Sequence, residues 1–354
     1  MIIRNLIAKA ILTQNGYSAP EITDAIKLDA NENPFTLQEP LKRRLADTLR
    51  SIDFNRYPAA GAPDLRERFA DYYGVKKNMI MPGNGSDELI QILCMAFRGK
   101  IKGVLVPSPT FSMYKIIAVN TGNKVVDVPL DQKFDLDVDA IAARIKNNFP
   151  ALIFLSSPNS PTGNLFSRER IEAVIRKAPG VVVIDEAYSA FAGQSLLPLL
   201  KKYKNVVFLK TLSKLGMASI RLGFLIGNPD LIDQLDKVRL PYNVNALSQK
   251  AAGFFLDHEG EFIKQIKEII QRRQELYREI KKIKWIVPYP SRANFIFFSC
   301  AFDANRIYKD LVSQGIIVKT LNLAPRMPDG IRVTVGSKKE NQAFLDALKN
   351  ITPE

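Results

Sequence analysis

Four polar segments carry the residue types that could perform chemistry in this chain. Three of them directly follow apolar runs: SSPNSPTG at 156–163, DEAY at 185–188 and TLSK at 211–214, with Arg221 a few residues further on. The fourth is the loop GNGSDE at 83–88, which opens an apolar helical pattern. In open α/β sheets, ligands bind at the carboxyl ends of the strands. The sequence therefore predicts one site to which several strand ends contribute.

Lys214 and Asp185 have the most specific chemistry. A lysine that follows a strand, with no acid beside it in sequence, loses its proton more easily when it is desolvated, and the neutral amine forms an imine with an aldehyde. Asp185 ends the apolar run VVVID, where a buried carboxylate needs a partner such as a protonated pyridine nitrogen. Taken singly, Lys214 is typical of a surface lysine, and Asp185 fits a cap equally well, so the two carry weight only together.

The remaining polar residues suit the other parts of a ring cofactor. Ser86 and Asp87 stand at a helix start, where backbone N–H groups favour a phosphate, although neither GK[ST] nor the GxGxxG spacing is present. Arg221 could fork onto the same phosphate. Tyr188 could donate from its hydroxyl, and Phe111 could stack on a flat ring or simply belong to the core. A cofactor with an aldehyde, a phosphate and a basic nitrogen would use all of these groups.

Composition excludes several classes of function. The 354 residues contain two cysteines, Cys94 and Cys300, and one histidine, His258, so a disulfide framework, a transition-metal site and a Ser-His-Asp triad are all disfavoured. The net charge of +14 is spread along the chain, which favours anionic small molecules over nucleic acid as partners. No apolar run reaches the roughly 18 residues of a membrane helix. The first twenty residues predict an N-terminal helix and a cytoplasmic protein, with a weak transit peptide as the alternative.

The elements that must position these residues alternate between helices and short apolar strands. Continuous apolar strands separated by helices predict a largely parallel sheet that is covered on both faces. After PYNVN at 241–245 the pattern changes to a long charged helix, roughly 260–284, and then to strands ANFIFFS, GIIVKTL and GIRVTVGS. We expect a large α/β domain at 35–245 and a smaller α+β domain that combines 1–34 with 246–354.

These residues resemble those of a known family. The segments LDANENP at 28–34, RYP at 56–58, PTFSMY at 109–114, PYNVN and IRVTVG at 331–336, together with the four above, occur in the order seen in histidinol-phosphate aminotransferases. The resemblance runs from about residue 17 to 348. It implies a fold-type I pyridoxal-phosphate enzyme and a homodimer, with a mostly parallel seven-stranded sheet flanked by helices in the large domain. The implied reaction is amino transfer between L-histidinol phosphate and 2-oxoglutarate, a phosphorylated amine and a 2-oxo acid.

The resemblance also implies a role for each site residue. Lys214 would form the Schiff base, Asp185 would pair with the pyridinium nitrogen, and Tyr188 would bond the phenolic oxygen. Phe111 would stack on the ring. The coenzyme phosphate would be held by Ser86, Asp87, Ser213, Arg221 and the other subunit's Tyr57. The substrate would be contacted by Tyr17, Asn31, Lys319 and Arg332, and Arg332 would bind the substrate's α-carboxylate.

Two departures from the family pattern leave questions open. Relatives often read PNNPTG where this chain has Ser160, so either Asn159 or Ser160 could contact the phenolic oxygen. Lys319 stands where some relatives carry an arginine, and lysine keeps the charge but loses the bidentate fork. Rival functions are an aromatic or broad-range aminotransferase, a threonine-phosphate decarboxylase, a nicotinamide-dependent oxidoreductase, and a binding protein without catalysis.

Overall fold

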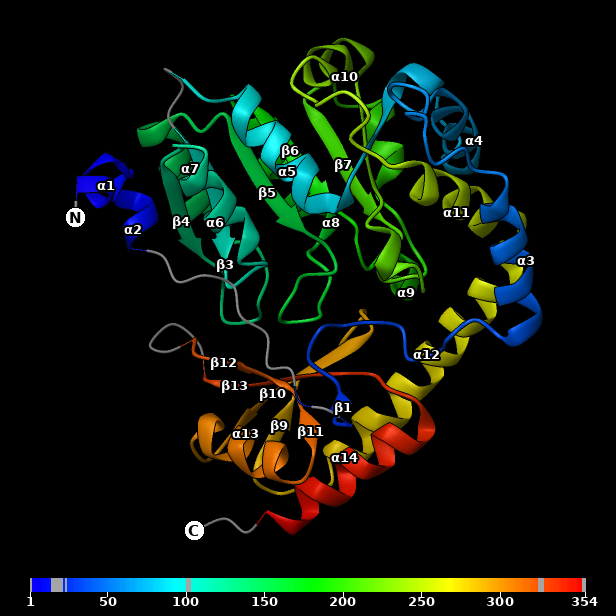
Figure 1. Ribbon diagram of the computed structural model, residues 1–354. Helices are drawn as coiled ribbons and strands as arrows, with labels where there is room; N and C mark the ends of the chain where they lie inside the picture. Colours follow the sequence, from blue (N-terminus) through cyan, green and yellow to red (C-terminus); the bar gives the residue numbers. More distant parts are fainter. Residues whose placement is uncertain (1, 14–21, 23, 100–102, 324–327, 352–354) are drawn as a thin grey trace.

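The computed structural model describes residues 2–13, 22, 24–99, 103–323 and 328–351. It shows a large α/β body, with a smaller α+β part that lies below it in the view of Figure 1. Two short helices, α1 (Ile2–Leu6) and α2 (Lys9–Leu12), begin the described part of the chain, and α2 packs against α6 (Met113–Asn120) of the large body. The N-terminal helix that the sequence predicts is therefore present, in two pieces.

The large body is built on a seven-stranded sheet. In spatial order its strands are β2 (Ile80–Gly83), β8 (Gly223–Gly227), β7 (Val206–Thr211), β6 (Val181–Asp185), β5 (Leu152–Ser156), β3 (Val104–Ser108) and β4 (Val125–Pro129). β8 runs antiparallel to β2 and to β7, whereas the pairs from β7 to β4 are parallel. The prediction of a mostly parallel seven-stranded sheet is confirmed.

Both faces of this sheet are buried, which explains its unbroken apolar strands. Along β6, Val182 and Ile184 belong to one apolar cluster, and Val181 and Val183 belong to the cluster on the opposite face. The helices α4 (Pro63–Tyr73), α7 (Val138–Asn148) and α8 (Arg168–Lys177) cover the first face, and α5 (Gly85–Ala96), α6 (Met113–Asn120) and α10 (Pro229–Asp236) cover the second. Because the side chains on both faces of a central strand pack against apolar helices, such a strand carries its polar residues near its ends.

The smaller part contains two sheets. The antiparallel sheet has the order β12 (Lys319–Leu321), β13 (Gly330–Thr334), β10 (Phe295–Cys300) and β9 (Ile286–Pro288), with α13 (Ala304–Ser313) and α14 (Lys338–Asn350) nearby. β1 (Ile26–Lys27) pairs in parallel with β11 (Ile316–Ile317). The segment GIIVKTL, expected as one strand, is thus divided between β11 and β12, each of which has a different partner.

One long helix, α12 (Glu259–Ile280), joins the two parts. It runs diagonally from the large body to the smaller part and packs against α14, and His258 separates it from α11 (Ala246–Asp257), as its position at a helix end suggested (Figure 1). α11 packs against α3 (Glu39–Arg50) and α4, so it lies with the large body. The division at 35–245 stays a prediction, but these contacts show that neither α2 nor α11 packs only within the smaller part.

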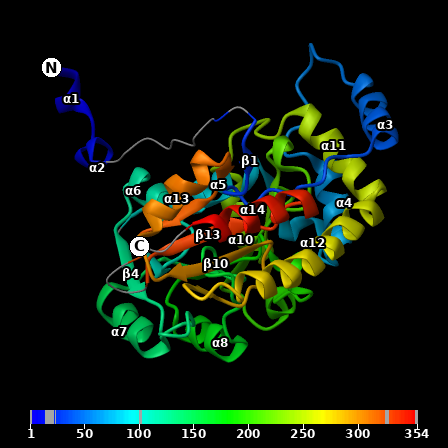
Figure 2. The same ribbon diagram turned by 90° about the horizontal axis from the view of Figure 1, so that it is seen from below.

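The remaining elements are short: α9 (Ser189–Ala192) and the 3₁₀ turns η1 (Lys77–Met79), η2 (Leu197–Lys201) and η3 (Ala218–Ile220). Viewed from below in Figure 2, α1 with α2 and α3 project from the same side of the molecule. Among the described helices, none is long and apolar enough to cross a membrane. The described residues also contain no cluster of His, Cys, Asp and Glu that could hold a metal ion.

Candidate active site

The polar residues singled out from the sequence meet at the carboxyl ends of β5, β6 and β7. They surround a cavity of about 100 Å³. The cavity is lined by Ser86, Asp87, Phe111, Ser156, Ser160, Asp185, Ala187, Tyr188, Thr211, Ser213, Lys214 and Arg221. The structure therefore brings residues from several strand ends together at one cavity, and their role as an active site stays a prediction.

Asp185 forms the buried floor of this cavity. Its carboxylate is 4% exposed. One oxygen accepts a hydrogen bond from the Tyr114 hydroxyl at 2.5 Å, and the other accepts from the backbone N–H of Ala187 at 2.9 Å. Burial raises the pKa of the Asp185 carboxyl above its usual value, and the two hydrogen bonds oppose that rise. A cationic or donating group that entered the cavity would therefore be attracted to this carboxylate.

Lys214 approaches the cavity from the loop after β7. Its Nζ donates to the backbone carbonyl of Ala30 at 3.0 Å, so residues from the LDANENP segment reach across to the site. The turn that carries the lysine is fixed by Thr211, whose hydroxyl donates to Ser213 Oγ at 2.9 Å and accepts from the Ser213 N–H at 3.1 Å. The amine is thus placed by the backbone and does not form an ion pair with Asp185.

On another wall of the cavity, the amino end of α5 lies next to Arg221. Arg221 Nη2 donates to Asp87 Oδ2 at 3.0 Å, while Asp87 Oδ1 is buried without a hydrogen-bond partner among the described residues. Gly85 has a φ of +82°, and a Cβ there would come within 2.8 Å of Arg221 Nη2. The close approach of the guanidinium to the helix end therefore depends on this glycine. Together the helix end and the guanidinium attract an anion.

Tyr188 is oriented by the N-terminal segment. Its hydroxyl accepts a hydrogen bond from the Asn31 side-chain amide at 2.9 Å, and its ring packs edge-on against Phe295. Asn31 itself has a φ of +54° and its N–H donates to Thr334 Oγ1 at 3.0 Å. Since Asn31 already supplies one donor to the phenol oxygen, the Tyr188 proton is free to be donated into the cavity.

Ser160, and not Asn159, faces the cavity. The Asn159 amide donates to the Pro109 carbonyl at 2.9 Å and to Thr162 Oγ1 at 2.7 Å, and its oxygen accepts from Thr110 at 2.7 Å. Asn159 is fully buried in that network. Ser160 lines the cavity, and its oxygen accepts from Arg332 Nη1 at 3.1 Å.

A second, adjoining cavity of about 340 Å³ extends from Lys214 toward the smaller part. Lys319 on β12 and Arg332 on β13 both line it, and they are direct register partners in the antiparallel pair. Arg332 also donates to the Asp29 carbonyl at 2.5 Å. Two cations side by side on one strand pair repel each other, so this wall favours an anionic group between them.

Some predicted residues lie elsewhere. Tyr57 lines neither of these two cavities; it is 81% exposed and stacks on Tyr242 at a centroid distance of 4.6 Å. Tyr17 lies outside the described residues. Tyr114, Ala30 and Tyr308 contact or line the site but carry no role in the sequence prediction. For Tyr114 a signal existed, because it stands in the segment PTFSMY only three residues after Phe111, at the start of α6. Ala30 acts through its backbone, for which residue type gives no signal.

The residues at the cavity fit pyridoxal phosphate, the cofactor that the sequence resemblance implies. A buried carboxylate with a raised pKa suits a pyridinium nitrogen, and the α5 end with Arg221 and Ser213 suits a phosphate. Lys214 supplies an amine for the aldehyde. Phe111 lines the same cavity and packs edge-on against Tyr114 at a centroid distance of 5.4 Å, which leaves it available to stack on a ring.

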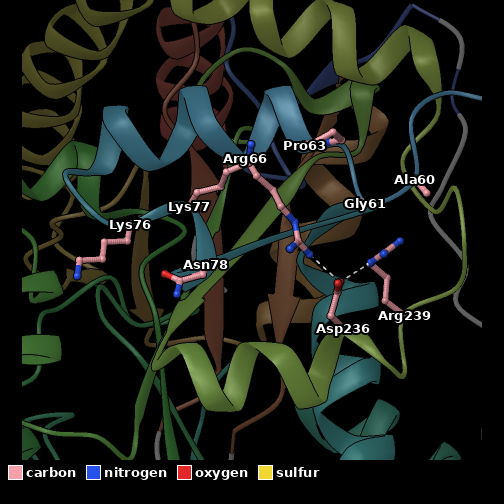
Figure 3. A pocket seen from close by; sticks show the side chains of 9 residues that line it. All are labelled: Ala60, Gly61, Pro63, Arg66, Lys76, Lys77, Asn78, Asp236 and Arg239. Atoms are coloured by element: carbon pink, nitrogen blue, oxygen red, sulfur yellow. Dashed lines mark hydrogen bonds and ion pairs between the residues drawn. The ribbon is translucent and has the colours of Figure 1, made fainter.

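A larger pocket, the basin, lies at the opposite end of the large body from the candidate site, and its charged residues have a structural role. It has a volume of about 580 Å³, and four of its nine lining residues are basic (Figure 3). Asp236 accepts from Arg66 at 2.6 Å and from Arg239 at 2.7 Å, as the dashed lines show. This shared carboxylate ties α4 to the end of α10. No residue predicted for the site lines the basin.

Comparison with known proteins shows the family to which the chain is similar. Residues 23–348 match the model of the aminotransferase class I and II family. The chain is 42% identical over 338 residues to histidinol-phosphate aminotransferase 2 of Nitrosococcus oceani, which covers 95% of this chain and 94% of that protein. It is 38% identical over 345 residues to the histidinol-phosphate aminotransferase of Aquifex aeolicus, with 97% of each covered.

A solved structure extends the likeness to the fold. The histidinol-phosphate aminotransferase of Sinorhizobium meliloti, crystallised in complex with pyridoxal-5'-phosphate, superposes with a TM-score of 0.86 at 22% identity and covers 98% of both chains. With its strand-end lysine and carboxylate, its seven-stranded sheet and a family match over nearly its full length, this chain belongs to the aminotransferase class I and II family.

Proposed function

We propose that this protein is a pyridoxal-phosphate-dependent aminotransferase that transfers the amino group of L-histidinol phosphate to 2-oxoglutarate. One observation carries the proposal: the Lys214 amine and the buried Asp185 carboxylate line the same small cavity, next to a wall with paired cations. Relatives that bear the name histidinol-phosphate aminotransferase match nearly the whole chain. The products would be L-glutamate and imidazole-acetol phosphate, which is the ketone that corresponds to the amine. This reaction is the one expected in histidine biosynthesis.

The chain's own residues divide the chemical work. When bound, pyridoxal phosphate supplies an aldehyde that accepts amino groups and a ring that withdraws electrons from the substrate α-carbon. Asp185 holds a proton on the ring nitrogen, because a buried carboxylate is stabilised by the positive charge that this proton brings. Lys214 would remove the proton from the substrate α-carbon and deliver it to the coenzyme carbon that carried the aldehyde, acting as general base and then as general acid. Tyr188, oriented by Asn31, donates to the phenolic oxygen.

Binding of the phosphate and of the substrate uses the two charged ends of the site. The amino end of α5 with Ser86 and Asp87, and Ser213 with Arg221, would hold the coenzyme phosphate. Lys319 and Arg332 would accept the phosphate of the amine in one half-reaction and a carboxylate of the 2-oxo acid in the other. Ser160, hydrogen-bonded to Arg332, would link this wall to the phenolic oxygen. Asn31 lines the substrate cavity, and Tyr17 stays a prediction.

We further infer a homodimer in which Tyr57 reaches the phosphate of the other subunit's coenzyme. The support is the exposed Tyr57–Tyr242 stack and the exposed apolar side chains that lie close to these two residues in sequence, Phe54, Leu240 and Leu247. Such exposed apolar side chains are typical of a surface that a second molecule covers. A cytoplasmic location stays a prediction.

The test of this function is product formation with named substrates. L-histidinol phosphate and 2-oxoglutarate should yield glutamate, and Lys214→Ala should lower kcat by at least about 10²–10⁴-fold, the contribution of a positioned general acid and base. Lys237→Ala is the matched control, since Lys237 is exposed and its side-chain partners within the described residues, Asp233 and Gln234, both belong to α10. Borohydride treatment should fix the coenzyme on Lys214.

The rival functions predict other outcomes. Release of carbon dioxide from threonine phosphate without a 2-oxo acid would indicate a decarboxylase. Faster turnover of phenylalanine than of histidinol phosphate would keep the amino-transfer chemistry and discard the proposed substrate. Coenzyme fixed on a lysine other than Lys214 would overturn the site.

A further inference from the structure

We propose that Tyr114 is a positioning residue for this reaction, whose buried hydroxyl holds the Asp185 carboxylate in the orientation and charge state that the coenzyme's ring nitrogen requires. The inference rests on the proposed function, in which Asp185 faces that nitrogen. Tyr114 lies behind Asp185, outside the cavity lining, and would contact neither coenzyme nor substrate. It would therefore act only through Asp185.

The contact between the two residues is short and fully enclosed. The Tyr114 hydroxyl donates to Asp185 Oδ2 at 2.5 Å, and the tyrosine side chain is 0% exposed. Tyr114 is the only side-chain donor to this carboxylate among the described residues, since Oδ1 is bonded by the backbone of Ala187. Because Tyr114 is fully buried and lies outside the cavity lining, removal of its hydroxyl leaves Oδ2 without that donor.

The surroundings of Asp185 make a donor necessary. Asp87 and Glu186 are both acids, and their charges add to burial in disfavouring the ionised form of Asp185. A hydrogen bond to the carboxylate counteracts this effect by stabilising the negative charge. Burial raises the pKa of Tyr114 well above its usual value, and the neighbouring Asp185 charge raises it further. Tyr114 therefore keeps its proton and stays a donor at any pH at which the enzyme works.

The packing of Tyr114 fixes the direction of that donor. Its ring stacks on Phe154 of β5, with centroids 4.7 Å apart and planes 11° apart, and it packs edge-on against Phe111. Phe111 lines the cavity as the candidate that stacks on the coenzyme ring. A single buried tyrosine therefore supports both the residue expected on the ring's face and the residue expected at the ring's nitrogen.

The variant Tyr114→Phe removes one hydroxyl and keeps the shape of the ring. In its holoenzyme, a less stabilised carboxylate becomes more basic and draws the shared proton away from the ring nitrogen. With coenzyme labelled with ¹⁵N in the ring, the nitrogen resonance should shift toward that of the unprotonated form. We expect kcat to fall about 10- to 100-fold, the usual weight of a hydrogen bond to a charged group, and the KM for the amine to change little.

A merely structural role would give a different result. It would lower the melting temperature of the apoenzyme while the nitrogen resonance and kcat of the folded holoenzyme stayed at the wild-type values, and that outcome would overturn the inference. The matched control is Tyr203→Phe, which removes a tyrosine hydrogen bond of 2.8 Å to Glu172 far from the cavity lining. It should leave both readouts unchanged.

Two further variants keep the test decisive. If Tyr114→Phe does not fold, 3-fluorotyrosine at position 114 offers a stronger donor of nearly the same size, and the resonance should move in the opposite direction; no movement would refute the role. Asp185→Asn separates the two proposals. If it leaves the resonance and kcat unchanged, the function assigned to Asp185 fails together with the role of Tyr114. If it changes both while neither Tyr114 variant does, only the role of Tyr114 fails.

Discussion

At the scale of single residues, the Asp185 carboxylate favours binding of the coenzyme but lowers the stability of the protein without it. Without coenzyme, its ionised carboxylate is buried at a cost, because burial raises its pKa above the ordinary value of 3.8. The sign follows from linkage: the cost is absent below pH 3.8, where the group is protonated in both the folded and the unfolded state. It grows as the pH rises toward the folded-state pKa, and is fully present above it. The same carboxylate stabilises the protein only when a cation is bound beside it.

We therefore predict that Asp185→Asn makes the apoenzyme more stable than the wild type at pH 7, and that the difference shrinks as the pH approaches 4. The Ala187 N–H can donate to the oxygen of the new amide and the Tyr114 hydroxyl can accept from its nitrogen, so the variant gains from losing the buried charge. Saturation with pyridoxal phosphate should reverse the order, because the wild type binds the coenzyme more tightly. Urea unfolding of apo and holo forms at several pH values measures both effects.

Asp131→Asn provides the control with the opposite sign. Burial raises the pKa of Asp131, but hydrogen bonds from Arg170 and from two backbone N–H groups outweigh it, and the net pKa is lowered. Its stabilising contribution is therefore present above pH 3.8 and is lost as the pH falls through the lowered pKa. Asp131→Asn should destabilise the protein at pH 7 with or without coenzyme. An Asp185→Asn apoenzyme that is also less stable at pH 7 would contradict the analysis.

The residue types identified most of this site, but not the bonds between them. Lys214, Asp185 and Arg221 could be predicted because each is polar at the end of an apolar run. The choice between Asn159 and Ser160 could not be made from the sequence, since either side chain could face the cavity. It is decided by Thr110, Pro109 and Thr162, whose groups saturate the Asn159 amide.

At the scale of elements, a buried ion pair joins β6 and β7 just below the site. Glu186 follows β6 and is 3% exposed, and Lys210 on β7 is 7% exposed. Their side chains are hydrogen-bonded to each other, and Glu186 also accepts from Ser195 at 2.6 Å and from the Leu196 N–H at 2.5 Å. The pair therefore ties two strand ends to the turn that leads into η2.

We predict that Lys210→Met destabilises the protein by about 3–5 kcal/mol, because it leaves the Glu186 charge buried without a cation. The double variant Lys210→Met with Glu186→Gln should recover most of that loss, since the amide can still accept from Leu196 without a charge. Urea unfolding of both single variants and the double variant gives the coupling energy. If the double variant were as unstable as the sum of the two single variants, the pair would carry no coupling and the assignment would be wrong.

Long elements with a clear hydrophobic pattern could be predicted from the sequence, whereas very short elements could not. The long charged helix, the apolar strands and the helix at 338–350 follow directly from spacing. β1 has only two residues, Ile26 and Lys27, and exists because β11 offers a free edge far along the chain. The antiparallel direction of β8 is likewise set by its neighbours, since an apolar strand such as GFLIG has no directional signal of its own.

At the scale of the whole molecule, the exposed stack of Tyr57 on Tyr242 is the feature that a single chain leaves unexplained. Phe54 is 77% exposed and Leu240 is 70% exposed, each close in sequence to one ring of the stack. Tyr57 also lines a cavity of about 600 Å³ together with residues of α3, α4 and α11. The helices that project in Figure 2 lie on one side of the molecule. A two-fold dimer would bury such a surface symmetrically and bring Tyr57 of each copy near the site of the other.

Complementation between two inactive variants tests this arrangement. Lys214→Ala removes the amine of a subunit's own site, and Tyr57→Ala removes the residue that the subunit would lend to its partner. A heterodimer of the two would contain one site with neither residue and one site with both.

Coexpression at equal levels should therefore restore activity to about a quarter of the wild-type value at limiting coenzyme, since half of randomly paired dimers are mixed and each has one complete site. If Tyr57 serves its own subunit, no site in the mixture has both residues, and the coexpressed pair stays as inactive as its parents. Leu240→Glu places a charge in the proposed interface, so it should shift the sedimentation of the protein from dimer to monomer and abolish the complementation with it.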